Sequence, residues 1–180
     1  MKKITLFILS FVFTLLNVQA QKSNIVPIDE ITKLVTYQEV VEKEGAADTL
    51  YLRAIGWIND FYENPTDVTK VRDREGGKII GKARIKLMDY DKGGSPIPSK
   101  TIIHYTLKLD FKDGKFRYAF TDFIVLKTSR FPLERWITEG DNEYCLTCDD
   151  YFTQIDDYVK VVVKNMKKGM EPPVIIKDEW

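Results

Sequence analysis

Two cysteines separated by two residues are the feature of this sequence best suited to chemistry. Cys145 and Cys148 are the only cysteines among 180 residues, and His104 is the single histidine. A pair at this spacing can close a disulfide, act as a redox dithiol or supply two metal ligands. A zinc site needs more ligands than these, and Asp149 and Asp150 beside the pair disfavour a reactive thiolate. We therefore expect a structural disulfide, with inert free thiols and a redox or metal function as the alternatives.

A glycine-rich segment, residues 76–83, resembles a phosphate-binding P-loop only in part. Such a loop needs a Ser or Thr after its lysine and a helix whose N-terminal amides face the phosphates. Here Ala83 follows Lys82, and the next residues alternate between apolar and charged types, as in a strand. The segment therefore predicts a turn without a nucleotide site, and Gly81 is expected at a bulge or a close contact.

The other polar candidates lack the neighbours that catalysis or metal binding requires. His104 shares the parity of Lys108 in an alternating run, so it is expected on the solvent side, and no nucleophile or orienting acid can be assigned to it. The acidic residues Asp141 and Glu143 lack the glycine and the ligand spacing of an EF-hand loop. We predict no catalytic residue, no metal site and no cofactor.

Residues 129–150 show no periodicity and contain large side chains outside any expected helix or strand. Arg130, Trp136 and Tyr144 are of the types enriched at contact surfaces, although such aromatic residues also cover cores. We interpret the segment as an irregular insertion and residues 130–150 as a contact surface. Trp180, at the end of the chain, allows the same two interpretations.

The elements around these candidates follow from hydrophobic periodicity. A strand is expected within residues 34–44, and a helix from an N-cap at Asp48 to the Asn64-Pro65 pair. Residues 79–87 alternate as a strand, and a second helix over 151–169 has a Thr153/Asp156 pair that resembles a capping box.

A β-hairpin around Asp113-Gly114 is the clearest local prediction. Alternating apolar residues flank the pair, and a two-residue loop there sets Asp110 opposite Arg117. Strict continuation of this register would put Asp122 beside Tyr105 on the apolar side. A buried carboxylate needs partners, so we expect either a bulge or a specific hydrogen bond at this position. The opposite, charged side of these strands, which includes Lys82, Arg84 and Lys86, is expected to face solvent or a partner.

The N-terminus has the features of a secretory signal peptide. Lys2 and Lys3 precede an apolar run over residues 4–16, and Val18-Gln19-Ala20 fits a cleavage site before Gln21. Removal of these 20 residues from 180 leaves 160, with 25 basic and 27 acidic residues and a net charge of −2. This balance gives no reason to expect nucleic acid as a partner, and no later segment is apolar enough to span a membrane. We expect a periplasmic or secreted protein.

The sequence also resembles a family of secreted bacterial proteins that carry a domain of unknown function with a fold like that of the TATA-box-binding protein. The similar segments are TYQEVV at 36–41, LYLRAIGW at 50–57, GKIIGK at 77–82 and YAFTDF at 118–123. The resemblance covers about residues 34–127, implies the fold and brings no known activity or site residues. A shared fold does not imply DNA binding.

Together these observations predict an α+β fold, β-α-β-β-β-β-α, with one antiparallel sheet and two helices on one of its faces. The expected segments are a signal peptide (1–20), a lead-in (21–33), an α+β core (34–128), the insertion (129–150), a helix of the core (151–169) and a tail (170–180). We expect a non-enzymatic envelope module that binds a protein or small ligand. The alternatives are a redox protein or enzyme that uses Cys145 and Cys148, and a self-associating scaffold.

Overall fold

The computed structural model describes residues 25–173. The predicted signal peptide, the cleavage before Gln21 and Trp180 lie outside the described residues. The elements in chain order are β1 (Tyr37–Glu42), α2 (Ala47–Phe61), α3 (Pro65–Val68), β2 (Thr69–Asp73), β3 (Lys78–Tyr90), β4 (Pro96–Lys112), β5 (Lys115–Leu126), β6 (Arg130–Pro132), the 3-10 helix η2 (Leu133–Trp136) and α4 (Asp149–Gly169).

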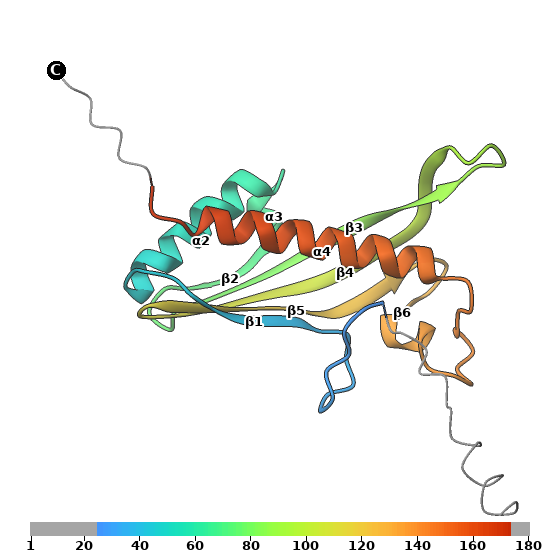
Figure 1. Cartoon of the computed structure of the whole chain (residues 1–180), viewed down its shortest axis with the longest axis horizontal. Coiled ribbons are helices and arrows are strands. Elements are labelled where there is room, and N and C mark those ends of the chain that lie inside the picture. The colour runs from blue at the N-terminus through green and yellow to red at the C-terminus, as the bar shows by residue number, and fades with distance from the viewer. Residues whose placement is uncertain (1–24, 174–180) are drawn as a thin grey trace, which may run out of the picture.

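Six antiparallel strands form one sheet, and the long helices α2 and α4 lie together on one side of it (Figure 1). The strand order is β1-β5-β4-β3-β2, and the short β6 pairs with the end of β5. This arrangement confirms the predicted α+β class. None of the helices within residues 25–173 is long and apolar enough to cross a membrane.

The core lies between the helices and the sheet. Helix α4 buries the predicted stripe at a 3-to-4-residue spacing, and Ile155, Val159 and Val162 are fully buried. Helix α2 contributes Leu50 and Trp57, and alternate residues of β4 and β5 complete the layer. The apolar periodicity of the sequence therefore explains which face each element buries.

The predicted hairpin is confirmed in detail. Strands β4 and β5 are joined by Asp113-Gly114, and Gly114 has the positive φ of 74° that a glycine adopts without strain. Asp110 lies opposite Arg117, and the guanidinium donates to the carboxylate at 2.8 Å.

The predicted irregularity at Asp122 is a bulge. The β4–β5 register shifts between His104 and Thr106, and Asp122 has a φ of 53°. The bulge turns the carboxylate out of the core, where it is exposed and lies 3.6 Å from the ammonium of Lys108. Phe123 then returns to the apolar side and is fully buried.

Several local expectations are wrong. Residues 65–73, for which no helix or strand was predicted, form α3 and the edge strand β2, whose mostly polar sequence has no alternation. Residues 129–150 are not wholly irregular, because β6 and η2 bring Phe131, Leu133 and Trp136 into the core. Three residues are too few to give β6 a readable period.

Both predicted helix caps are also wrong. Helix α2 begins at Ala47, with Ala46 as its N-cap, so Asp48 lies in the first turn and pairs with Arg74. Helix α4 begins at Asp149 and not near 151, which places Thr153 inside the helix, where its hydroxyl donates to the Asp149 carbonyl at 2.9 Å.

Candidate functional site

The two cysteines form a disulfide within the loop that leads into α4. Cys148 is the N-cap of that helix and is buried, and the backbone N–H of Cys145 donates to the Trp136 carbonyl at 3.1 Å. The bridge therefore joins the start of α4 to the segment that follows η2. This position fits the structural interpretation of the pair.

The three residues predicted to form a contact surface do not share one surface environment. Trp136 is 5% exposed and stacks on Tyr151, so it covers the core and is not available to a partner. Tyr144 is half-buried, and Arg130 is exposed at the start of β6. Arg130 and Tyr144 therefore remain candidates for contact, and the residues that surround Arg130 come from other strands.

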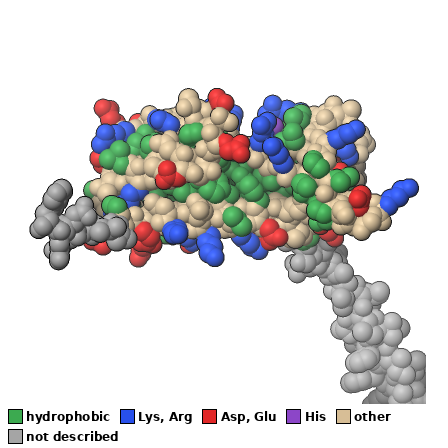
Figure 2. All heavy atoms as spheres, turned by 90° about the horizontal axis from the view of Figure 1, so that it is seen from above, with side chains coloured by type: hydrophobic (Ala, Val, Ile, Leu, Met, Phe, Trp, Pro, Cys, Tyr) green, Lys and Arg blue, Asp and Glu red, His purple; other side chains and the backbone are tan. Residues whose placement is uncertain are grey.

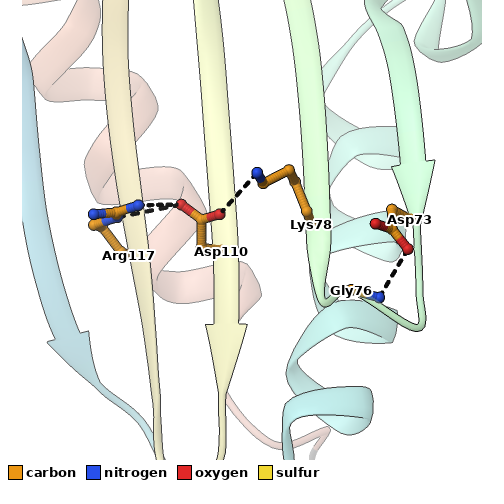
Figure 3. Close-up of polar contacts among 5 residues, drawn as sticks. All are labelled: Asp73, Gly76, Lys78, Asp110 and Arg117. Atoms are coloured by element: carbon orange, nitrogen blue, oxygen red, sulfur yellow. Dashed lines mark hydrogen bonds and ion pairs between the residues drawn. The ribbon is translucent and has the colours of Figure 1, made fainter.

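We define the open face as the side of the sheet opposite the helices. On its half nearest the β4–β5 turn, Asp110 accepts from Arg117 at 2.8 Å and lies 3.9 Å from the ammonium of Lys78 (Figure 3). Lys108 and Asp122 form a further ion pair on the same half. Asp110 and Asp122 therefore offset part of the positive charge of Lys78, Lys108 and Arg117 on this half.

The other half of the open face carries a cationic cluster, which we define as Lys82, Arg84, Lys86, His104 and Arg130. The strand register brings them together: Arg84 lies opposite His104, and Lys86 shares a cross-strand row with Arg130 through the residues between them. Among residues 25–173, no ion pair joins Lys82, Arg84, Lys86 or Arg130 to an acid. The cluster is therefore a local excess of positive charge on a nearly neutral chain.

The pKa of His104 records this positive surrounding. Partial burial lowers the pKa of the imidazole, and the charges of Arg130 and Arg84 lower it further. A neutral imidazole at neutral pH can donate one hydrogen bond and accept another. His104 lies opposite Arg84, whereas a general base would have an acid beside it to orient the imidazole. This arrangement gives no support for acid–base catalysis.

A groove of about 630 Å³ borders the cluster along the edge of β3. Figure 2 shows Lys and Arg side chains gathered beside the single histidine, at a notch in the surface. We call this the edge groove; it is lined by Phe61, Tyr62, Glu63, Asn64, Asp67, Val68, Lys82, Ala83, Arg84, Ile85, Lys86, His104 and Tyr158. The groove therefore extends from the open face around the strand edge to the helix layer.

Three tyrosine hydroxyls meet where the edge groove reaches the helix layer. The Tyr105 hydroxyl lies 3.0 Å from that of Tyr62 and 3.2 Å from that of Tyr158. Burial raises the pKa of all three phenols, so they are neutral at neutral pH. Tyr62 and Tyr158 line the groove, while Tyr105 is 1% exposed and supports them from the core.

The remaining sequence candidates show structural roles. The glycine-rich segment includes the end of the β2–β3 turn, where Gly77 has a φ of 58° and Asp73 accepts from the Gly76 N–H at 2.8 Å (Figure 3). A Cβ on Gly81 would lie 3.4 Å from Val68, which is ordinary van der Waals contact, and the β2–β3 register shifts opposite Gly81, between Thr69 and Val71. Asp141 accepts from the Arg135 guanidinium at 3.0 Å. Within the described part of the chain, no group of three or more metal-ligating side chains is present.

Sequence reasoning placed Lys82, Arg84 and Lys86 on a solvent-facing strand side but did not find the edge groove. The groove depends on where β2 stops pairing with β3 and on the path of α3, and no helix or strand was predicted for the residues that form α3 and β2. Pro65 at the first position of α3 was the available signal for a helix there.

The fold agrees with the comparisons with known proteins. Residues 37–125 match the sequence model of a domain of unknown function (DUF4468) with a TBP-like fold. This region of the chain belongs to the DUF4468 family. The match ends before β6, so η2, the disulfide and α4 lie outside it.

Two solved structures share the fold of this DUF4468 protein. A DUF4468 family protein from Bacteroides ovatus has a TM-score of 0.66 and 13% identity, over 84% of this chain and 93% of that chain. A TBP-like protein from Parabacteroides distasonis has a TM-score of 0.61 and 14% identity, over 81% of this chain and 97% of that chain. No curated protein matches the sequence. These similarities establish the fold and assign no activity.

Proposed function

We propose that this DUF4468 protein is an exported, non-enzymatic module of the cell envelope that binds a protein or small ligand through the cationic cluster. The supporting observation is the concentration of Lys82, Arg84, Lys86 and Arg130 on a sheet face that no described helix covers (Figure 1). Unpaired cations beside a groove attract an anionic group, and the groove walls supply contact area.

Export is supported by the features of the N-terminal 20 residues and by the disulfide, since disulfides persist in oxidising compartments. The two alternative functions have less support. Both cysteine sulfurs are held in a bridge in which Cys148 is 5% exposed and Cys145 is half-buried, and Asp149 and Asp150 beside the pair disfavour a thiolate. Self-association of the cationic cluster would bring like charges together.

A site-specific photocrosslinker tests the proposed function. Placed at position 84 in protein expressed in its own host, it should give discrete adducts with a protein or small molecule of the envelope. Lys168, exposed at the end of α4, is a matched control position on the helix layer. Adducts from position 84 that disappear on Lys82→Glu/Lys86→Glu substitution support the proposal. Equal adducts from both positions, or none from position 84, contradict it.

A further inference from the structure

The outer edge of β3 is covered at both ends and open in the middle. At one end, β2 pairs with β3 only from Lys78 to Gly81. At the other end, the Gln154 side chain of α4 accepts from the Met88 N–H at 2.8 Å and donates to the Met88 carbonyl at 3.0 Å. The six residues between, 82–87, have no strand beside them on this edge within the described chain.

Open strand edges are usually covered or shortened, because their unpaired backbone groups pair readily with other chains. Gln154 provides such cover for Met88, since its amide presents one acceptor and one donor as a neighbouring strand would. The uncovered stretch is about 20 Å long at about 3.3 Å per residue. The edge groove, with a volume of about 630 Å³, follows this stretch over Lys82–Lys86.

The two sides of this edge differ in chemistry. On the open face, the side chains that would flank an added strand are Lys82, Arg84 and Lys86. On the helix side, Ala83 and Ile85 share the groove with Tyr62 and Tyr158. Side chains on the same face of neighbouring strands contact each other directly. An added strand would therefore fit best with acids toward the open face and apolar residues toward the helices.

We infer that an extended peptide with alternating acidic and apolar residues adds as a strand to β3 at residues 82–87. The inference rests on the proposed function and names the partner class for it. Backbone hydrogen bonds along the open edge provide affinity, and the alternating side chains fix the register and the face. Glu63 and Asp67 on the groove wall disfavour acids on the helix side, which makes the alternation selective.

One competing occupant and the other open edges fit less well. A second copy paired through the same edge would set Lys82, Arg84 and Lys86 against like charges. The outer edges of β1 and of the five-residue β2 are also open within the described chain. The groove beside β1 is smaller, about 350 Å³, and Lys167 there is already paired with Glu39 at 2.6 Å. The edge of β3 therefore combines the larger groove with cations that have no acidic partner within the described residues.

Binding of a synthetic heptapeptide to the chain from residue 21 tests this inference. The probe is acetyl-Glu-Val-Glu-Val-Glu-Val-Glu-amide, and its affinity is measured by calorimetry with amide exchange followed by NMR. We expect binding and slowed exchange confined to backbone amides within 82–88. A peptide of the same composition with its acids and valines in two blocks should bind at least about tenfold more weakly.

N-methylation of alternate peptide residues separates strand addition from charge attraction. The modified peptide keeps every carboxylate but loses backbone donors, so its affinity should fall at least about tenfold. Equal affinity of both peptides, or protection at β1 in place of β3, overturns the inference. Lys82→Glu/Arg84→Glu/Lys86→Glu should abolish binding, whereas Lys70→Glu/Lys112→Glu/Lys115→Glu, with the same change in net charge, should retain it.

The two proposals can fail separately. If neither peptide binds while the position-84 crosslinks persist, strand addition is overturned and the binding function stands. If the crosslinks are also absent, both are overturned. A chain that dimerises through residues 82–87 at the concentrations used, with no peptide affinity, would instead support the scaffold hypothesis and overturn the inference.

Discussion

Asp113, in the β4–β5 turn, caps the N-terminus of helix α2 by accepting a hydrogen bond from the Ala47 N–H at 2.8 Å. The helix has no side-chain cap of its own, because its N-cap residue is Ala46. The first backbone N–H groups of a helix need acceptors, and a carboxylate also interacts favourably with the helix dipole. A residue 66 positions away from Ala47 in the sequence therefore caps the helix, as was predicted for Asp48.

Replacement of Asp113 tests this cap. Asp113→Ala should reduce the free energy of unfolding by about 1 kcal/mol, because the Ala47 N–H loses its acceptor. Asp113→Asn retains a side-chain oxygen at the same position and should lose clearly less. Asp48→Ala is the matched control and should cost less than Asp113→Ala, since Asp48 is exposed and pairs with Arg74 at the surface. Urea denaturation measures all three, and equal losses for Asp48→Ala and Asp113→Ala would contradict the assignment.

Two helical glycines should respond in opposite directions to alanine. A Cβ at Gly169 would lie 2.8 Å from Trp57 Cδ1 and 2.9 Å from Trp57 Cβ. Trp57 is buried, and its indole N–H donates to the Asn165 side chain at 2.9 Å, so it has little freedom to move. Gly169→Ala should therefore destabilise the protein by about 1–3 kcal/mol through overpacking.

Gly56 provides the matched control within helix α2, because a Cβ there meets no atom within 4 Å. Gly56→Ala should raise the free energy of unfolding by about 0.5–1 kcal/mol, as alanine loses less backbone entropy in a helix. Thermal denaturation followed by circular dichroism shows whether each of the two substitutions raises or lowers the stability. A stabilising Gly169→Ala would show that α4 and α2 are packed less closely than described.

Loss of the disulfide should lower stability while the fold is retained. Cys145→Ser/Cys148→Ser removes a short covalent loop before α4, and we expect a loss on the order of 2–3 kcal/mol. Denaturation of the unchanged protein with and without a reductant should give the same difference in the free energy of unfolding. If the double variant is as stable as the parent but fails to form the envelope adducts, a functional role of the cysteines would gain support.

The sequence predicted those parts of the fold that are determined by residues within one short segment. The Asp113-Gly114 turn and the alternation around it determined the β4–β5 register, and the position of Asp122 in that register required a bulge or a partner. The α4 stripe was readable because 21 residues repeat the same period. Each of these features depends on neighbours close in sequence.

The features that were missed depend on distant residues or on very short elements. The capping of α2 by Asp113 becomes visible only when the hairpin and the helix are placed in space. Trp136 could not be assigned to core or surface until β6 was paired with β5. The edge groove exists because β2 stops pairing at Gly81, which no local pattern of residues 65–73 indicates.

His104 offers a direct measurement of the charge in the cationic cluster. Its imidazole pKa is lowered by partial burial and by the charges of Arg130 and Arg84, so the folded protein disfavours the protonated form relative to the ordinary value of 6.5. This contribution to stability is full above 6.5 and decreases as the pH falls from 6.5 through the folded-state pKa, because the unfolded chain then binds more protons.

An NMR titration of the single histidine should give a midpoint below 6.5. Arg130→Gln and Arg84→Gln should each raise the midpoint, whereas Lys112→Gln, at the far end of β4, should leave it unchanged. Bound acidic heptapeptide should raise the midpoint as well, since its carboxylates favour the imidazolium, and the peptide should then bind more tightly as the pH is lowered through this range. A midpoint at or above 6.5 that neither arginine substitution changes would show that Arg84 and Arg130 do not act on His104. The five residues would then not form one electrostatic cluster.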